Sequence, residues 1–256
     1  AVLVRLHPLA ADALAHVRMV AKHGVGVDNI DVAAARALGV VVANTPGANA
    51  DAVAEQALML MLMLALARDL DGQREGRRGA VRGLEGRRLF LVGFGASAGR
   101  VAKLAAAFGM AVSAWTPSGR ALGVPRAASL AAGLAAADIL SLHCPLTPQT
   151  RGMIGAAEIA AMPRGALIVN CARGGIVDER ALADALRSGH LGGAALDVTE
   201  EEPLPQDHPL RAVAGLVLTP HAAGLSEGAF RRMGMQAAQN ILDWRAGRLA
   251  PEATVA

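Results

Sequence analysis

Short runs of consecutive apolar residues alternate along the chain with stretches in which apolar residues recur at helical spacing. In the stretch 178–189, Leu182, Ala185 and Leu186 share one helical face, and Gly189 suits the C-cap position. Apolar runs typical of strands cover residues 2–6, 39–44, 89–93, 111–115, 139–143, 166–170, 193–198 and 216–220. Strands that are apolar on both faces and separated by helices are typical of a parallel sheet covered on each side. The pattern therefore predicts a doubly wound α/β chain.

Two expected helices differ from the others in the distribution of their apolar residues. The segment 50–69 is apolar on nearly every side, so one sheet face cannot bury it, and we expect it to cross between domains or to pack against its copy in a homodimer. Its most apolar run, 57–67, is about half the length of a bilayer span, so we expect no membrane partner. The last helix, from residue 227 to about 247, carries its apolar residues on one stripe and is expected to dock on one side.

Composition and charge narrow the range of partners. Because the formal net charge is only +3 and the chain has four Phe, two Trp and no Tyr, we expect no nucleic-acid partner. The basic segment 74–88 is compatible with phosphate contact but more typical of a solvated loop. The two cysteines, Cys144 and Cys171, have no metal-ligand spacing, so we expect no metal and interpret them as reduced thiols of a cytoplasmic protein.

A glycine turn lies between the strand expected at 89–93 and the helix that follows it. Gly93 permits the tight turn, and Gly95 lets the backbone approach a pyrophosphate whose charge the helix N-terminus meets. Ala98 replaces the third glycine of the dinucleotide-binding pattern, and Thr116 stands where an acidic residue is usual. The segment predicts a cofactor site, and a turn that serves packing alone is the alternative.

Seven blocks of this sequence follow one another in the order and spacing of a known family. They are KHGVGVDNID (22–31), NTPGANADAVAE (44–55), GFGASAGRVA (93–102), HCPLTPQTRGMI (143–154), NCARGGIVDERAL (170–182), ALDVTEEEPLPQDHPL (195–210) and LTPHAAG (218–224). Over nearly its whole length the chain resembles the D-isomer-specific 2-hydroxyacid dehydrogenases, most of all their phosphoglycerate, glyoxylate and hydroxypyruvate reductase branch. The resemblance implies a Rossmann-type doubly wound sheet and a second, smaller flavodoxin-like substrate domain.

The resemblance implies catalytic roles for three residues. Reduction of a 2-keto acid by hydride transfer develops negative charge on the carbonyl oxygen, and a histidine suits the proton donor that this requires. The resemblance places His221 there, with Glu202 as the carboxylate that orients its ring, and it places Arg173 where a guanidinium binds the substrate carboxylate. Taken singly, these are a surface histidine, one member of an acidic run and a loop charge. All three follow expected strands, however, at the sheet edge where ligands bind.

Further contacts are implied by the same resemblance. The backbone amides of Val25 and Gly26 match a second anchor for the substrate carboxylate, and Asn49 matches a contact at the domain junction. The expected cofactor-binding residues are Gly93, Gly95, Ala96, Ser97, Thr116, Arg120, Cys144, Pro145, Thr150, Cys171, Ala172, Asp197 and Gly224.

The stretch after the strand at 111–115 bears on the choice between NAD and NADP. In NAD-specific relatives an aspartate there holds the ribose hydroxyls and repels a 2′-phosphate. Here Thr116 is neutral, while Ser118 and Arg120 suit a phosphate, so we expect NADP to be slightly favoured. The alternative is an enzyme that accepts both cofactors while Arg120 points into solvent.

We expect residues 1–49 to form a partial substrate domain, 50–221 the dinucleotide-binding domain, and 222–256 a C-terminal helix that returns to the substrate domain. Because the family's substrate domain begins before the point that matches Val2, we expect this one to be incomplete at its N-terminus. The connection 69–88 is also short for the family and lacks its usual tryptophan.

The sequence thus predicts an NAD(P)-dependent oxidoreductase that transfers a hydride to or from a small 2-keto or D-2-hydroxy acid. Glyoxylate, hydroxypyruvate and compounds like 3-phosphoglycerate are the expected substrates. A corepressor or regulatory module of the same fold, acting through protein partners, is the alternative. A formate dehydrogenase is less compatible, because in those relatives the position matching Glu202 is glutamine.

Overall fold

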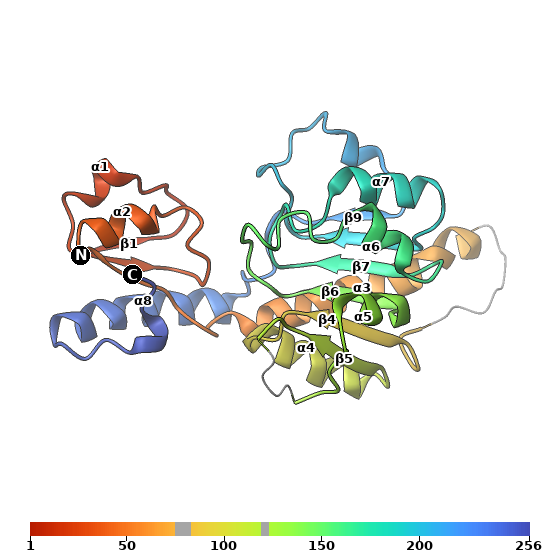
Figure 1. Cartoon of the computed structure of the whole chain (residues 1–256), viewed down its shortest axis with the longest axis horizontal. Helices are drawn as coiled ribbons and strands as arrows, with labels where there is room; N and C mark the ends of the chain where they lie inside the picture. Colours follow the sequence, from red (N-terminus) through yellow and green to blue (C-terminus); the bar gives the residue numbers. More distant parts are fainter. Residues whose placement is uncertain (75–82, 119–122) are drawn as a thin grey trace. The chain divides into compact units, whose positions relative to one another are not determined.

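The computed structural model of the chain describes residues 1–74, 83–118 and 123–256. Contacts divide them into two compact units, residues 1–52 with 224–256, and residues 53–223. Each unit is built on its own parallel sheet (Figure 1). Arg120, one of the expected cofactor-binding residues, lies outside the described residues, as does most of the basic segment 74–88.

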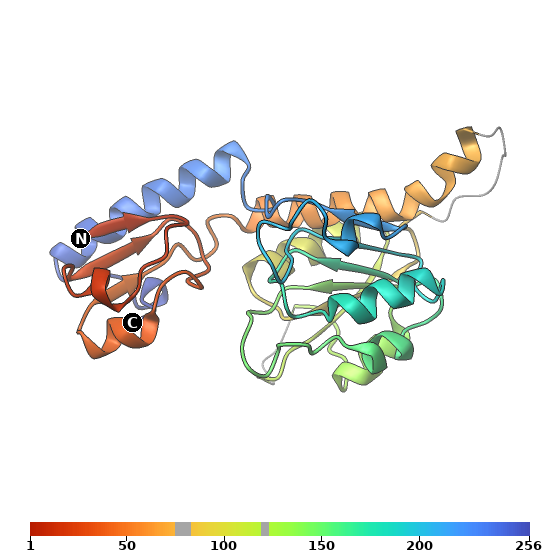
Figure 2. The ribbon, with the colours of Figure 1, turned by 90° about the horizontal axis from the view of Figure 1, so that it is seen from above.

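The first unit holds a three-stranded parallel sheet in the order β1-β2-β3. Its elements are β1 (Val2–Val4), α1 (Ala11–Leu14), β2 (Met19–Lys22), α2 (Val32–Ala37), β3 (Val41–Ala43), α8 (Glu227–Arg245) and the 3-10 turn η2 (Pro251–Ala253). The long helix α8 runs along this sheet (Figure 2), where Met19 and Ala21 of β2 pack against Ala237. Val20, between them, belongs to the opposite cluster with Leu14 of α1. Alternate residues of β2 are thus buried on both faces.

The strand β2 is one that the hydrophobic pattern does not predict. All four of its residues are buried, including Lys22. The Lys22 ammonium donates to the carbonyl oxygen of Arg5 and, at 2.6 Å, to Oδ1 of Asn29. The apolar run of β2 is only three residues long and ends in a lysine, so hydrophobicity alone does not predict a buried strand there. Lys22 can be buried because Arg5 and Asn29 accept its hydrogen bonds.

The second unit is a doubly wound α/β domain, as the sequence predicts. Its six parallel strands follow in the order β5-β4-β6-β7-β8-β9. Its elements are α3 (Ala50–Arg74, from Val53 onward), β4 (Arg88–Val92), α4 (Ala96–Ala107), β5 (Ala111–Trp115), α5 (Leu130–Ala136), β6 (Ile139–Leu142), α6 (Ala156–Ala161), β7 (Leu167–Asn170), α7 (Glu179–Arg187), β8 (Gly193–Leu196), η1 (Pro209–Ala212) and β9 (Leu216–Leu218). The chain runs from β4 out to β5 and then returns to β6 on the other side of β4. Ligands bind at the carboxyl ends of the strands where the order reverses in this way.

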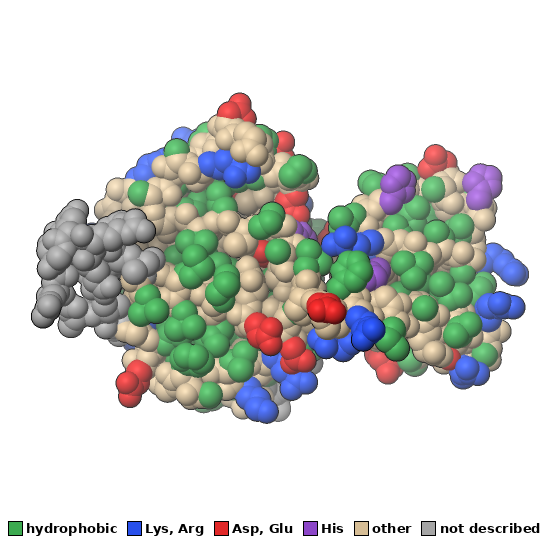
Figure 3. All heavy atoms as spheres, turned by 180° about the vertical axis from the view of Figure 1, so that it is seen from behind, with side chains coloured by type: hydrophobic (Ala, Val, Ile, Leu, Met, Phe, Trp, Pro, Cys, Tyr) green, Lys and Arg blue, Asp and Glu red, His purple; other side chains and the backbone are tan. Residues whose placement is uncertain are grey.

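The helix α3 is buried on one side and exposed on the other. Leu60, Met61 and Leu64 are buried, whereas Met59 and Met63, four residues apart on one face, are exposed. Figure 3 shows hydrophobic side chains gathered on the face of the second unit that lies behind the sheet in Figure 1, where α3 runs. In the part of the chain that the structure describes, no helix has the length and apolar character to cross a bilayer.

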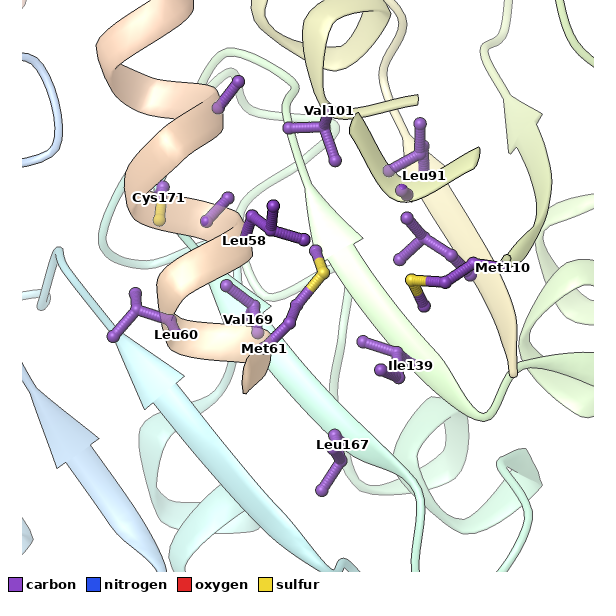
Figure 4. Packing of buried hydrophobic residues seen from close by; sticks show 14 of the residues in the cluster. Leu58, Leu60, Met61, Leu91, Val101, Met110, Ile139, Leu167, Val169 and Cys171 are labelled. Carbon is purple, nitrogen blue, oxygen red and sulfur yellow. The ribbon is translucent and has the colours of Figure 1, made fainter. Parts of the chain in front are cut away.

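Apolar side chains cover both faces of the six-stranded sheet. Along β4, Leu89 and Leu91 belong to one cluster and Phe90 and Val92 to the other, as the two-residue repeat of a strand requires. The first cluster packs under α3 and α4, and Figure 4 shows Met61 of α3 among its side chains. The second cluster packs under α5, α6 and α7. With both faces covered, the strand ends are left for polar chemistry.

Gly133 lies where α5 packs closely on the sheet. A Cβ there would lie 2.1 Å from Cζ of Phe90, whose side chain is fully buried. We expect Gly133→Ala to lower the free energy of unfolding in urea by about 2 kcal/mol, because overpacking outweighs the gain in helix propensity. Gly99→Ala in α4 is the control, since a Cβ there would meet nothing within 4 Å, and it should be neutral or stabilising. Equal stability of the two variants would contradict this packing.

Candidate active site

The loops that carry the predicted catalytic residues leave the carboxyl edge of the six-stranded sheet. Arg173 follows β7, Glu202 follows β8 and His221 follows β9. Because these strands are parallel neighbours, their carboxyl ends meet at one edge. The structure therefore brings Arg173, Glu202 and His221 to the same part of the second unit.

His221 and Glu202 form a hydrogen-bonded ion pair. Nδ1 of His221 lies 2.7 Å from Oε2 of Glu202, and the other carboxylate oxygen, Oε1, accepts the N–H of Thr199 at 3.1 Å. An ionised carboxylate only accepts, so Nδ1 carries a proton and Nε2 is the ring atom left to exchange one. The side chains of His221 and Glu202 are 50% and 37% exposed, so a small molecule in solution has access to them.

The pair holds each partner in its charged form. The hydrogen bond to Glu202 raises the pKa of His221 against the opposing effects of burial and of the charge on Arg173. Burial by itself would raise the pKa of Glu202, but the hydrogen bond and charge of His221, with the Thr199 N–H and Arg173, lower it. His221 therefore stays an imidazolium to a higher pH than an ordinary histidine, which suits a proton donor.

Asp197 holds the loop that carries His221 in a strained conformation. His221 has a φ of 51°, a left-handed conformation that no other non-glycine residue adopts in the described ranges. Its N–H donates to the Asp197 carbonyl at 2.7 Å. The buried carboxylate of Asp197 accepts from Oγ1 of Thr219 at 2.5 Å and from the N–H groups of Ala222 at 2.9 Å and Ala223 at 2.8 Å. Asp197 thus anchors this loop, and its expected contact with the cofactor stays a prediction.

Asn170 anchors the loop that carries Arg173. It ends β7 and is 1% exposed. Its Nδ2 donates to the Arg173 carbonyl at 2.8 Å, and its Oδ1 accepts the N–H of Ala172 at 2.9 Å. Asn170 was not among the expected site residues, and its signal in the sequence is a polar residue that closes an apolar strand.

Gly174 lets the Arg173 loop approach the segment that leads to Glu202. A Cβ at Gly174 would lie 1.8 Å from the carbonyl oxygen of Thr199, so no other residue fits there without moving the backbone. The charge of Arg173 acts on the pKa values of both Glu202 and His221, in keeping with this close approach. The charges of Arg173, Glu202 and His221 therefore influence one another.

The glycine turn after β4 fits a pyrophosphate. Gly93 has a φ of 86°, and a Cβ there would lie 2.6 Å from the backbone carbonyl of His143, so the turn packs against the loop after β6. Gly95 is the N-cap of the 12-residue helix α4, and a Cβ there would meet nothing within 4 Å. The helix starts with Ala96 and Ser97, and no side chain caps it. Backbone N–H groups at an open helix N-terminus suit phosphate oxygens.

A cluster of polar groups lies at the carboxyl end of β5. Thr116 is buried, and its Oγ1 lies 3.1 Å from Oγ of Ser118. Arg126 is held beside it, because its Nη2 donates to the Thr116 carbonyl at 3.1 Å and its backbone pairs with Ala114 of β5. Arg126 was not expected at this site. No local pattern marks it, since a separate segment brings it to the strand end.

The other expected cofactor contacts in this unit lie in the loops after β6 and β7. In the first loop, Thr150 Oγ1 donates to the Pro145 carbonyl at 2.7 Å, and Cys144 is half-buried. Burial raises the pKa of the Cys144 thiol to about 11. Cys171 and Ala172 begin the second loop and are buried, and burial raises the pKa of the Cys171 thiol as well. Both thiols are therefore neutral near pH 7.

The remaining expected contacts belong to the first unit. Val25 and Gly26 follow β2, and Nδ2 of Asn44 donates to the Val25 carbonyl at 2.7 Å. Gly224 lies against Asn49, since a Cβ at Gly224 would be 2.7 Å from Nδ2 of Asn49. Contacts of these residues with substrate or cofactor stay predictions. Within the residues that the structure describes, no three histidine, cysteine or acidic side chains are placed to hold a metal.

Comparison with known proteins agrees with this architecture. The chain is 40% identical over 244 residues to a D-3-phosphoglycerate dehydrogenase of Methanocaldococcus jannaschii, a match that covers 91% of the chain and 46% of that protein. It is 40% identical over 252 residues to a glyoxylate reductase of Aeropyrum pernix, covering 91% and 75%. A crystal structure of a protein from Thermus thermophilus has 38% identity and a TM-score of 0.86, covering 99% of this chain and 85% of that one.

The chain spans about half the length of the first of these relatives and three quarters of the second. The family model for the NAD binding domain of D-isomer specific 2-hydroxyacid dehydrogenases matches residues 57–223, which is more than half of the chain. The chain therefore belongs to the D-isomer specific 2-hydroxyacid dehydrogenases.

Proposed function

We propose that this chain carries the activity of an NAD(P)-dependent oxidoreductase that interconverts a small 2-keto acid and its D-2-hydroxy acid. The observation that carries the proposal is the 2.7 Å contact between Nδ1 of His221 and Oε2 of Glu202, at the sheet edge that also bears Arg173. Relatives named phosphoglycerate dehydrogenase, glyoxylate reductase and hydroxypyruvate reductase support substrates of this class. They also favour catalysis over a purely regulatory module.

The residues of the site divide the chemistry between them. Arg173 binds the carboxylate of the 2-keto acid and polarises the adjacent carbonyl. A nicotinamide cofactor, with its pyrophosphate held at the turn of Gly93 and Gly95, would supply the hydride that reduces the carbonyl carbon. As negative charge develops on the oxygen, Nε2 of His221 gives it a proton, while Glu202 keeps its hydrogen bond to Nδ1. In the reverse direction the neutral ring takes the proton of the substrate hydroxyl.

Replacement of His221 tests the proton donor. We expect His221→Gln to lower kcat at least ~100-fold, the scale of a lost general acid, with cofactor affinity nearly unchanged. The measurement is NADPH oxidation with glyoxylate and with hydroxypyruvate. His7→Gln, a change at an exposed histidine of the first unit, should leave kcat as it was. A His221→Gln variant that keeps most of its turnover would remove His221 from the mechanism.

We infer that NADPH is used at least as well as NADH, with NADP slightly favoured. The polar cluster at the end of β5 contains no described acidic side chain, and the position expected to be acidic in an NAD-specific site is the neutral Thr116. Arg126, bound to the Thr116 carbonyl, brings a permanent positive charge to this strand end. A 2′-phosphate gains from that charge and meets no repulsion, whereas a ribose hydroxyl finds no carboxylate to bind.

Cofactor kinetics test this preference. We expect kcat/KM for NADPH at least equal to that for NADH, and Arg126→Ala should lower kcat/KM for NADPH ~10-fold or more with little effect on NADH, the loss of a charged hydrogen bond. Thr116→Asp should make NADH the better cofactor, since a carboxylate repels the 2′-phosphate. Arg164→Ala, at an exposed arginine bonded to the Gly189 carbonyl, is the control. A kcat/KM for NADH ten or more times that for NADPH would overturn the inference.

We propose further that the chain forms a homodimer through α3. The exposed side of this helix bears Met59, Met63 and Leu66. Together with Leu62 of the same helix and Leu104 of α4, these side chains line an apolar groove of about 560 Å³. Contiguous apolar surface of this kind is costly to leave in water and marks an interaction site. The same helix of a second copy supplies a matching apolar surface.

Light scattering at micromolar concentration tests the dimer. We expect the unchanged protein to have twice the mass of the chain and the double variant Met59→Glu, Met63→Glu to be monomeric, because a buried, unpaired carboxylate opposes association. Met235→Glu, at an exposed methionine of α8, is the matched control and should remain dimeric. A monomeric unchanged protein would refute the proposal.

A further inference from the structure

One peptide unit close to the active site is held from both sides. The carbonyl oxygen of Thr199 faces Gly174, where a Cβ would lie only 1.8 Å away. The N–H of Glu200, at the other end of the same peptide, donates to Oε1 of Glu179 at 2.6 Å. Glu179 is the first residue of α7, whose N-cap Asp178 accepts the N–H groups of the two residues after Glu179. The peptide thus lies between the start of a capped helix and the Arg173 loop.

This peptide unit adjoins the group that orients Glu202. The N–H of Thr199 donates to Oε1 of Glu202 at 3.1 Å, while Oε2 of the same carboxylate meets Nδ1 of His221 at 2.7 Å. Oγ1 of Thr199 donates to the Glu201 carbonyl at 2.7 Å and closes the segment on itself. A shift of the Thr199–Glu200 peptide therefore moves a donor to the carboxylate that supports the proton donor.

We propose that Glu179 is a positioning residue, which keeps Glu202 aligned on His221 by holding the Thr199–Glu200 peptide against Gly174. Glu179 itself touches neither His221 nor Glu202 in any hydrogen bond of the described residues and acts through the backbone. The inference rests on the proposed function, because it assigns Glu179 to the acid–base pair of the same site.

The hydrogen bond from the Glu200 N–H to Glu179 depends on the charged groups and the cavity around it. Burial raises the pKa of Glu179, the Glu200 N–H and His208 lower it, and the charges of Glu200 and Asp178 raise it. Glu179, Glu200 and His208 line a solvent-open cavity of about 540 Å³, where Arg151 meets Glu200 at 3.5 Å. Water in that cavity is a ready alternative partner for the Glu200 N–H once the carboxylate is gone, so the peptide is freed without leaving a buried unpaired donor.

The experiment measures the ring pKa of His221 by NMR in the full chain without substrate. The groups that set it are Glu202, Arg173 and Asp197. We expect Glu179→Ala to lower this pKa by about half a unit or more, since a misaligned carboxylate stabilises the imidazolium less. Glu179→Gln should stay close to the unchanged protein, because its amide oxygen still accepts the Glu200 N–H. Glu179→Asp keeps the charge but is one methylene too short, so it should behave like Glu179→Ala.

Activity gives a second measurement. Because the raised pKa keeps the imidazolium at higher pH, kcat/KM for glyoxylate reduction with NADPH is full below that pKa and falls as the pH rises through it. The fall should begin at lower pH in Glu179→Ala, and Glu202→Gln should show the full loss, with no further shift when the two are combined.

Glu227→Ala is the matched control, because Glu227 is likewise the first residue of a side-chain-capped helix, α8, and its loss removes the same favourable contact with the helix dipole. It should leave the pKa of His221 unchanged. An unchanged pKa in both Glu179→Ala and Glu179→Asp would overturn the proposal, as would an equal shift in Glu179→Gln. Failure of the proposed function would show differently, as an unchanged protein that oxidises no NADPH with any 2-keto acid.

Discussion

Burial of both faces of the six-stranded sheet is the constraint on which the site depends. Side chains of β4 alternate between two apolar clusters, Leu89 and Leu91 in one and Phe90 and Val92 in the other. A polar group inside such a strand needs a partner of its own, since an unpaired one costs several times the free energy of a typical hydrogen bond. Polar chemistry is therefore moved to the strand ends, where the N–H groups of the connecting loops supply those partners.

Two buried polar side chains hold the loops in place at that edge of the sheet. Asn170 at the end of β7 and Asp197 just beyond β8 are each 1% exposed. Asn170 directs its hydrogen bonds to the loop that follows β7, and Asp197 directs its own to the loop that follows the neighbouring strand β9. The left-handed backbone of His221 costs about 1–3 kcal/mol. Three donors on the Asp197 carboxylate offset that cost, because hydrogen bonds to a charged group contribute about 1.5–3 kcal/mol each. The strained loop of His221 is thus held by hydrogen bonds to a buried carboxylate.

Different parts of this structure could be predicted from the sequence for different physical reasons. The strands of the second sheet leave continuous apolar runs, so all six were predicted. The strand β2 was missed because its three apolar residues end in Lys22, whose burial depends on pairing with the Arg5 carbonyl and Asn29. His221 and Glu202 are 19 positions apart and show no pattern of their own, so their pairing came from the family resemblance. Side chains that bond to backbone, such as Arg126 and Glu179, were missed. Their partners are a carbonyl and an amide, groups that nearly every residue has.

Arg173, Glu202 and His221 act on one another through their charges. In the protein alone, Arg173 lowers the pKa of His221 while Glu202 raises it. Under the proposed function, a substrate carboxylate on Arg173 cancels part of that positive field at the ring, so the imidazolium becomes more stable with substrate bound than without it. Before substrate binds, the side chains of His221 and Glu202 are partly exposed, so their charges cost little desolvation. A bound substrate also excludes water, which strengthens each of these charge interactions. Under the proposed function, the His221 imidazolium is therefore most stable when the substrate carbonyl that accepts its proton is bound.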